Sequence, residues 1–303
     1  MKILWFLAVG TLALAAPAQA VTRRDDVSEA QTIALASSLP VFSSVGNLSN
    51  FGSGVLISPT WVLTAAHCAV LNPSVFTLGS TTYTVNQTIV HPGYTGSIEN
   101  GFDIALVRLS TPVLDIAGAP LYTGTDELGK LGYHVGYGYQ GVGSTGHTGS
   151  GFGTKRAVQN IAEALGGVVP VANGNPRFSD DYLIADFDTP TGTPTRLSAY
   201  GSDTALPFEG SIAPGDSGGG FFVQDSQGVW RVAGIHSWID GVLPGGDGSD
   251  NASYTDLMGS TRVSTYNSWI LANAAPEPSS LALLALPMLG AVGLYRRNRA
   301  SHS

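Results

Sequence analysis

The chain has 303 residues, a formal net charge of −8 and 12% charged side chains. This length allows two small hydrophobic cores or one large one, and the acidic balance disfavours nucleic acid and anionic lipid as partners. The 39 glycines, the many valines, isoleucines and threonines, and the lack of long helical periodicity between the two ends predict a turn-rich all-β protein.

Residues 1–20 predict a secretory signal peptide. Lys2 supplies the positive start, an apolar run covers 3–16, and Ala18-Gln19-Ala20 forms a small-residue cleavage site for signal peptidase. The alternative, a membrane anchor, needs a longer apolar run. Residues 21–39 form an N-terminal segment that begins polar and contains no clear strand.

Strands are expected from residue 40 onward, because apolar and polar side chains begin to alternate and glycine and proline turns separate them. The expected strands of this part are 41–45, 52–57, 61–64 and 82–90. Residues 40–123 should therefore form a first antiparallel barrel of about six strands.

Residues 124–272 are assigned to a second group of strands that ends in a helix. A Gly/Ser/Thr-rich surface loop over 138–154 and extended loops over 166–194 are expected within it. The Gly-x-Gly spacing near 136 is not followed by a helix, which disfavours a dinucleotide site. The expected strands are 131–138, 155–165, 181–187, 196–200, 220–224 and 229–237, and the helix is 261–270.

Three stretches carry residue types suited to nucleophilic catalysis. Gly215-Asp216-Ser217-Gly218-Gly219 surrounds a serine with glycines, which let backbone N–H groups approach a substrate carbonyl. A serine hydroxyl also needs a base to remove its proton and donors for the oxyanion. The apolar run Trp61-Val62-Leu63-Thr64-Ala65-Ala66 leads into His67, and Asp103 opens the apolar stretch 104–109.

These motifs, in the order His67, Asp103 and Ser217, resemble the active-site motifs of the trypsin/chymotrypsin-like serine proteases. The resemblance covers roughly residues 40–272. It implies two antiparallel six-stranded β-barrels, a short C-terminal helix and an active site in the cleft between the barrels. It also implies that His67 is the general base, that Asp103 holds the imidazole tautomer, and that the backbone N–H groups of Gly215 and Ser217 form the oxyanion hole.

The same resemblance implies roles for the N-terminus and for the single cysteine. In this family a new N-terminus beginning with Ile or Val folds inward and pairs with the acid before the catalytic serine, here Asp216. Signal cleavage would expose Val21 at once, whereas Val27 would need a further cut, and the usual Ile-Val-Gly-Gly start is absent. In this family the cysteine beside the catalytic histidine usually forms a disulfide, but here the second cysteine is absent. Cys68 is therefore expected to be a buried thiol, with intermolecular pairing as the alternative.

The resemblance places the primary substrate pocket between Ser211 and the strand that contains Ser237 and Trp238. Ser211 at the floor removes the ion pair that a Lys or Arg preference requires. Ile239 replaces a usual glycine and would narrow the pocket toward small apolar residues. His236 matches the histidine of a glutamate-specific bacterial branch, where it pairs with the substrate carboxylate. Its alternative position is behind the pocket wall, hydrogen-bonded.

The C-terminal segment, residues 273–303, is expected to be a linker and a sorting signal. Pro276-Glu277-Pro278 precedes an apolar run over 281–295, and Arg296-Arg297-Asn298-Arg299 follows it. This pattern resembles the PEP-CTERM signal of Gram-negative bacteria, which implies a temporary transmembrane helix that an exosortase removes. The exported domain would then be extracellular or on the cell surface after transient inner-membrane anchoring. A permanent anchor is the alternative.

The sequence thus predicts a secreted serine endopeptidase that acts on protein or peptide substrates without a cofactor. No metal site is expected, since the histidines are scattered and only a turn with Asp247 and Asp250 hints at calcium. A catalytically silent matrix or adhesion protein with the same fold is the main alternative. An esterase that uses the same three side chains is another.

Overall fold

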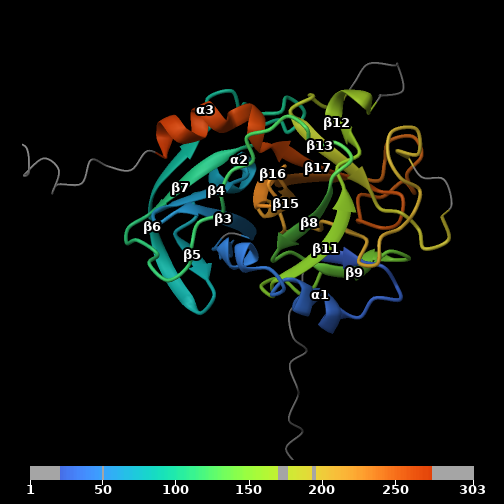
Figure 1. Ribbon diagram of the computed structural model, residues 1–303, viewed down its shortest axis with the longest axis horizontal. Helices are drawn as coiled ribbons and strands as arrows, with labels where there is room; N and C mark the ends of the chain where they lie inside the picture. The colour runs from blue at the N-terminus through green and yellow to red at the C-terminus, as the bar shows by residue number, and fades with distance from the viewer. Residues whose placement is uncertain (1–20, 50, 170–176, 193–195, 275–303) are drawn as a thin grey trace, which may run out of the picture. The chain divides into compact units, whose positions relative to one another are not determined.

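The computed structural model describes residues 21–49, 51–169, 177–192 and 196–274, and the strands within these ranges form three sheets (Figure 1). By its contacts the chain divides into a compact unit of residues 1–267 and a second unit of 268–303. The predicted signal peptide and almost all of the predicted sorting signal lie outside the described residues. Among the described helices, none is long and apolar enough to cross a membrane.

Six strands of the first half close into a barrel, seen on the left of Figure 1. Its interior holds buried apolar side chains, including Leu48, Leu56, Phe76 and Val107. Around the barrel the strands follow the order β2 (Val45–Leu48), β3 (Gly52–Ser58), β4 (Trp61–Thr64), β7 (Ala105–Leu109), β6 (Thr81–Val90) and β5 (Val75–Leu78).

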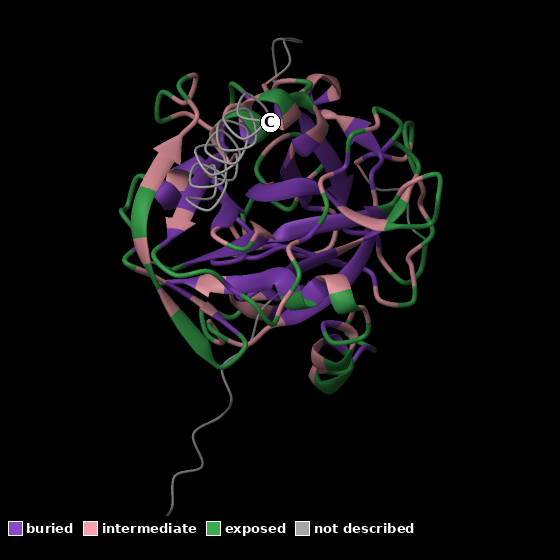
Figure 2. Cartoon of the chain, turned by 60° about the vertical axis from the view of Figure 1, so that its left-hand side comes forward, coloured by how far each residue is buried: buried purple, intermediate pink, exposed green. Residues whose placement is uncertain are grey.

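The second half forms a seven-stranded antiparallel sheet that does not close. The strand order is β11 (Arg156–Ile161), β8 (Leu131–Gly136), β15 (Gly220–Gln224), β16 (Trp230–Asp240), β17 (Leu257–Arg262), β13 (Tyr182–Asp186) and β12 (Ala164–Leu165). The strand at one edge, β12, has only two residues, so it is too short to pair with the strand at the other edge, β11. Figure 2 shows that most strands are buried, whereas β6 has no buried residue.

A small four-stranded sheet joins the start of the described chain to its second half. β1 (Val21–Arg23) runs parallel to β9 (Gln140–Val142) and antiparallel to β14 (Gly210–Ser211), and β10 (Gly146–His147) lies outside β9. The N-terminal segment therefore does contain a strand, which local alternation does not reveal. Helix α1 (Glu29–Leu35) follows, and Ser28 and Gln31 close its N-terminus with a capping box.

Two further strand predictions are wrong. Residues 41–45 were expected to be extended, but Pro40–Ser44 is a 3₁₀ helix, because Pro40 fixes its start and the Ser43 and Ser44 hydroxyls bond carbonyls three residues back. Residues 196–200 form turns. The mostly-β fold with a short C-terminal helix, α3 (Val263–Asn273), is confirmed, with one closed barrel and one open sheet in place of two closed barrels.

Candidate active site

His67 and Asp103 come together because the strands beside them are paired. His67 lies in the short helix α2 (Ala66–Ala69) after β4, Asp103 lies just before β7, and Thr64 of β4 is opposite Ala105 of β7. His67 Nδ1 is 2.7 Å from Asp103 Oδ2, and the His67 backbone N–H donates to Asp103 Oδ1 at 2.8 Å. One carboxylate thus fixes both the ring and the backbone of the histidine.

The Asp103 side chain is fully buried, and other donors surround it. The Ser237 hydroxyl donates to Asp103 Oδ2 at 2.5 Å, and the Thr261 hydroxyl donates to the Asp103 carbonyl at 2.9 Å. A buried carboxylate is tolerated when such donors replace water. Burial alone lowers the pKa of His67, but its hydrogen bonds and charge interactions with Asp103 and Cys68 outweigh burial and raise that pKa well above its ordinary value.

This raised pKa predicts an alkaline pH profile for any reaction that uses His67 as a base. Only the neutral imidazole accepts a proton, so kcat/KM should rise with pH as His67 loses its proton, with a midpoint above the ordinary value of 6.5. The profile can be measured with a chromogenic peptide from about pH 5 to about pH 10. A midpoint at or below that of free imidazole would contradict the role assigned to Asp103.

Ser217 lies at the end of a tight turn between β14 and β15. The Asp216 N–H donates to the Ala213 carbonyl at 2.9 Å. Gly215 has a φ of +95°, and a Cβ there would lie 2.9 Å from the Gly138 Cα and from the Phe152 ring. Only glycine fits this conformation and this space. Gly215 is therefore required by the turn itself.

The carbonyls of this turn show where its N–H groups point. The Pro214 carbonyl accepts from Tyr139 N–H at 2.7 Å, and the Asp216 carbonyl accepts from Gly219 N–H at 2.7 Å. In a trans peptide the C=O and the following N–H point in opposite directions, and no cis peptide is present among the described residues. The N–H groups of Gly215 and Ser217 therefore point away from these carbonyl partners, and neither donates to another described residue. They are available for an oxyanion.

The Ser217 carbonyl links the serine turn to the first half of the chain. Ser53 N–H donates to the Ser217 carbonyl at 2.7 Å, and the Cys68 thiol contacts the same carbonyl at 3.6 Å. Among the described residues, no hydrogen bond joins the His67 ring to the Ser217 hydroxyl. Catalytic hydrogen bonds of unliganded enzymes are often long and tighten when substrate binds.

Cys68 is buried, as expected, and Gly52 lies opposite it. A Cβ built on Gly52 would be 3.4 Å from the Cys68 Cβ and 2.9 Å from its Sγ. Disulfides have Cβ–Cβ separations of about 3.5–4.5 Å, so the backbone here is close to the geometry of a bridge although the second cysteine is absent.

Gly52→Cys should therefore form a disulfide with Cys68 and raise the free energy of unfolding by about 3 kcal/mol, because it closes a loop of roughly 15 residues. The measurement is thermal or denaturant unfolding with and without reductant. Gly52→Ser is the control, since it adds the same Cβ without a thiol. Detection of two reactive thiols in the unfolded, non-reduced variant would refute the geometry.

The cleft beside Ser217 encloses about 190 Å³. It includes three of the residues predicted for the substrate pocket and excludes two of them, Ser211 and His236. Ser211 is buried in β14, where it is paired with Thr22 of β1. The lining residues are Ile212, Ala213, Pro214, Ser217, Ser237, Trp238 and Ile239.

His236 is fully buried behind this wall, in the alternative position that the sequence left open. Its Nδ1 is 3.2 Å from the Asp216 carbonyl, and its Nε2 is 3.1 Å from Nδ1 of His134. Burial lowers the pKa of His236 to about 3, so the ring is neutral at ordinary pH. The ring nitrogens are thus directed to protein atoms.

The apolar side of the cleft continues into the interior. Ile239 packs against a buried cluster of Ala185, Ile212 and Met258. Ile212 also lines the cleft, and no charged side chain is present among the lining residues. The lining of the cleft is therefore uncharged and mainly apolar.

Asp216 is fully buried beside the serine turn. Its carboxylate accepts the N–H groups of Gly138 and Ala213, each at 2.8 Å, and the backbone N–H of Val21. Burial raises the pKa of Asp216 to about 7, although these donors oppose the shift. The structure therefore brings together the start of β1 and the residue before the candidate nucleophile.

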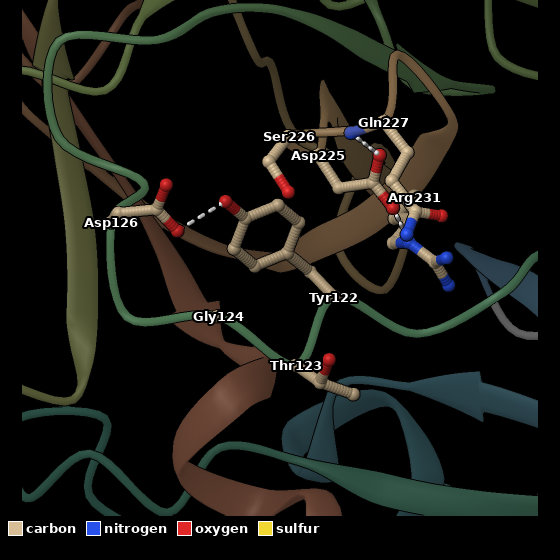
Figure 3. Close-up of a pocket in the computed structure, with 8 residues that line it drawn as sticks. All are labelled: Tyr122, Thr123, Gly124, Asp126, Asp225, Ser226, Gln227 and Arg231. Atoms are coloured by element: carbon tan, nitrogen blue, oxygen red, sulfur yellow. Dashed lines mark hydrogen bonds and ion pairs between the residues drawn. The ribbon is translucent and has the colours of Figure 1, made fainter.

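A larger cavity of about 290 Å³ shares no residue with the active-site cleft (Figure 3). Its charged groups pair with one another. The Tyr122 hydroxyl donates to Asp126 at 2.6 Å, and Arg231 forms an ion pair with Asp225. Its charged side chains are therefore engaged within the protein, and it carries none of the chemistry described above.

A family model described as Trypsin matches residues 29–270. The chain belongs to the trypsin family. This trypsin-family chain is 29% identical to transmembrane protease serine 11C of Mus musculus over 231 residues, which are 71% of this chain and 46% of the mouse protein. It is 32% identical to ovochymase of Halocynthia roretzi over 96 residues, which are 27% of this chain and 6% of ovochymase. The chain thus spans less than half the length of these curated relatives.

The trypsin fold is also found in a similar solved structure. Neuropsin, a serine protease expressed in the limbic system of mouse brain, aligns with a TM-score of 0.58 over 83% of this chain and 98% of its own. At 20% identity this likeness concerns the fold alone.

The sequence did not reveal several residues of the trypsin-family site. Ser53 holds the serine turn, since its hydroxyl donates to the Gly215 carbonyl at 3.0 Å and accepts from Tyr137 N–H at 3.0 Å. Met258 belongs to the buried cluster against which Ile239 packs. Ser53 lies far along the chain from the turn that it supports, and only its position between Gly52 and Gly54 at the start of β3 is a local signal.

Proposed function

We propose that this chain is a serine endopeptidase that hydrolyses peptide bonds of protein or peptide substrates through an acyl-enzyme. The observation that carries this proposal is the buried Asp103–His67 hydrogen bond at 2.7 Å beside a turn whose Gly215 and Ser217 N–H groups are available to an oxyanion. His67 would take the Ser217 proton as the hydroxyl attacks the carbonyl, and would return it to the leaving amine. The two N–H groups would stabilise the tetrahedral oxyanion.

The proposed activity is tested by incubating the domain with a peptide library and with a fluorophosphonate probe. Cleavage of peptides, together with its loss after labelling, is expected. A domain that reacts with neither would be the catalytically silent matrix or adhesion protein. A domain that is labelled and cleaves esters but not peptides would be an esterase.

The proposed activation uses the strand that begins at Val21. Val21 is fully buried, its backbone N–H bonds Asp216, and its φ is +59°. A β-branched residue rarely adopts a positive φ, which is strained. Cleavage after Ala20 would remove the peptide that defines this angle and would leave an ammonium group beside the Asp216 carboxylate. Signal peptidase would then produce the active N-terminus without a separate zymogen step.

The proposed destination is outside the inner membrane of a Gram-negative cell. The signal peptide over 1–20 and the Pro276-Glu277-Pro278 sorting signal support export, followed by removal of the C-terminal segment by an exosortase. The name of the mouse relative, a transmembrane protease, is compatible with an extracellular location. Intact-mass measurement of the exported protein tests this, since both segments should be missing.

The proposed preference is for small apolar residues before the scissile bond. The lining of the cleft contains no charged partner for a Lys, Arg or Glu side chain, and leaving such a charge unpaired costs several kcal/mol. His236, the candidate partner for Glu, is fully buried and bonded to His134. Ile239, which lines the cleft and packs against a buried cluster, would further narrow it.

Ile239→Gly should shift this preference toward larger apolar residues, because it removes a side chain from the cleft wall. Filling the new space should improve kcat/KM for Leu or Phe over Ala by about 10- to 100-fold. The measurement is a peptide-library profile. Val242→Gly, the same kind of change at an exposed position, is the control. A wild-type profile dominated by Lys and Arg would contradict the proposed pocket.

A further inference from the structure

Three acidic side chains lie together at one end of the seven-stranded sheet. Glu163 precedes β12, Asp186 ends β13 and Asp188 follows two residues later. Asp186 and Asp188 share a face because the backbone between them is extended, with Phe187 N–H donating to the Asp256 carbonyl. One carboxylate oxygen from each of the three lies within 4.8 Å of the others.

These three carboxylates are inside the protein. The exposed fractions of Glu163, Asp186 and Asp188 are 6%, 1% and 3%. A fourth acid, Glu209, is also buried, and the charges of Asp186 and Asp188 act on it. Carboxylates so close to one another and away from water repel unless a proton or a cation lies between them.

The hydrogen bonds leave part of this cluster unsatisfied. Glu163 Oε1 accepts from Ser202 N–H at 2.8 Å, and its Oε2 accepts from Asp186 N–H at 3.0 Å. Asp186 Oδ2 accepts from Leu197 N–H at 2.8 Å, but its Oδ1 is buried and has no hydrogen-bond partner among the described residues. The Asp186 carboxylate lies beside the Glu163 carboxylate. The unpartnered oxygen is therefore part of a carboxylate that belongs to the cluster.

Basic side chains do not neutralise this pair. Among the described residues, neither Glu163 nor Asp186 forms an ion pair with Lys or Arg. Arg196 is the base whose charge reaches Asp186, but it bonds the Asp240 carbonyl at 2.5 Å and lies 3.6 Å from the Asp240 carboxylate. The negative charge at Glu163 and Asp186 therefore lacks a cation from the protein.

The geometry points to a calcium site formed by the carboxylates of Glu163, Asp186 and Asp188. Ca²⁺ prefers oxygen ligands and tolerates irregular arrangements of them, whereas Mg²⁺ requires a strict octahedron. The calcium site suggested by Asp247 and Asp250 is weaker, because Asp247 accepts from Ser249 N–H and Asp250 accepts from Gly241 N–H, each at 2.8 Å. A bound ion would link the end of β13 to Leu197 and Ser202 in the segment that leads to β14.

The competing arrangement is a proton shared between Glu163 and Asp186. Burial and the neighbouring Asp186 raise the pKa of Glu163 to about 9. A shared proton would stabilise the fold at low and neutral pH and would be lost as the pH rises through that value. A cation would instead stabilise the fold at neutral pH in proportion to its concentration.

The test is thermal unfolding and isothermal titration calorimetry of the mature domain after removal of metals by EDTA. At neutral pH, CaCl2 should bind with a stoichiometry near one and raise Tm by about 5–10 °C at a hundredfold excess over Kd. MgCl2 should bind more weakly. Absence of Ca²⁺ binding, with a Tm that falls as the pH rises through about 9, would overturn the site in favour of the shared proton.

Variants locate the ion. Asp188→Asn keeps the shape of the side chain and the Glu163–Asp186 pair, and should weaken Ca²⁺ binding at least tenfold. Glu163→Gln/Asp186→Asn should abolish it. Asp247→Asn is the matched control and should bind Ca²⁺ like the wild type. If the double variant does not fold, Asp188→Asn decides alone, and Ca²⁺ binding that is unchanged by Asp188→Asn but lost in Asp247→Asn would place the ion elsewhere.

Discussion

Ser217→Ala should abolish peptide hydrolysis and fluorophosphonate labelling while leaving the fold intact. The hydroxyl would form the covalent bond to the acyl group, and loss of such a nucleophile lowers kcat by about 10⁶-fold. The Ser217 side chain donates no hydrogen bond to another described residue, so its removal leaves no buried partner unsatisfied. The change in the free energy of unfolding should therefore be close to zero.

The measurements are kcat/KM on a peptide substrate, gel detection of the probe, and thermal unfolding. Ser226→Ala is the matched control, because Ser226 is an exposed serine in the turn after β15. It lines the larger cavity of about 290 Å³ and not the active-site cleft. It should keep full activity. If Ser217→Ala is still labelled as strongly as the wild type, the nucleophile is another residue and the assignment fails.

A form that retains Ala20 ahead of Val21 should have kcat/KM about 10²- to 10³-fold lower than the form that begins at Val21. The expected ion pair between the Val21 ammonium and Asp216 is buried, and breaking such a pair costs about 3–5 kcal/mol. Asp216 directly precedes Ser217, and its own carbonyl helps to orient the Ser217 N–H. Loss of the ion pair at Asp216 would therefore loosen the turn that presents the Gly215 and Ser217 N–H groups.

The two forms should also differ in how their stability depends on pH. In the form that retains Ala20, burial raises the pKa of Asp216 from 3.8 to about 7, so the folded state binds this proton more tightly than the unfolded state. The resulting stabilisation is present below about pH 4 and is lost as the pH rises through about 7. In the form that begins at Val21, the ammonium group should pair with the Asp216 carboxylate, so this loss of stability with rising pH should not occur. Asp216→Asn should make the two pH profiles alike, and identical activities of the two unmodified forms would exclude activation at Val21.

The candidate catalytic residues could be placed from sequence because each motif is local. The stretch that ends in His67, the acid before an apolar strand and the glycine-flanked Ser217 each combine a reactive side chain with the backbone feature that presents it. The structure adds the 2.7 Å contact between His67 and Asp103, which follows from the pairing of β4 with β7. Spacing along the chain does not determine that pairing.

Features that depend on distant partners could not be predicted. Val21–Arg23 is a strand only because Gln140–Val142 and Gly210–Ser211 lie on either side of it. His236 occupies a position compatible with a pocket or with the space behind it, and its bond to His134, which is 102 residues away, decides between them. Glu163 directly precedes β12 and Asp186 ends β13, so only the three-dimensional pairing of these two strands brings the acids together.

The arrangement of the small sheet would also tie the proposed activation to the order of synthesis. Thr22 pairs with Gly141 on one side and with Ser211 on the other, so the first strand of the domain cannot dock until residues 140–142 and 210–211 have been made. Contacts this distant form late in folding, because the entropy of closing the intervening loops opposes them. Residues that leave the ribosome early would thus be among the last to reach their places. A chain interrupted before Ser211 could not bury Val21 between these strands. Such an unfinished domain would lack the proposed proteolytic activity.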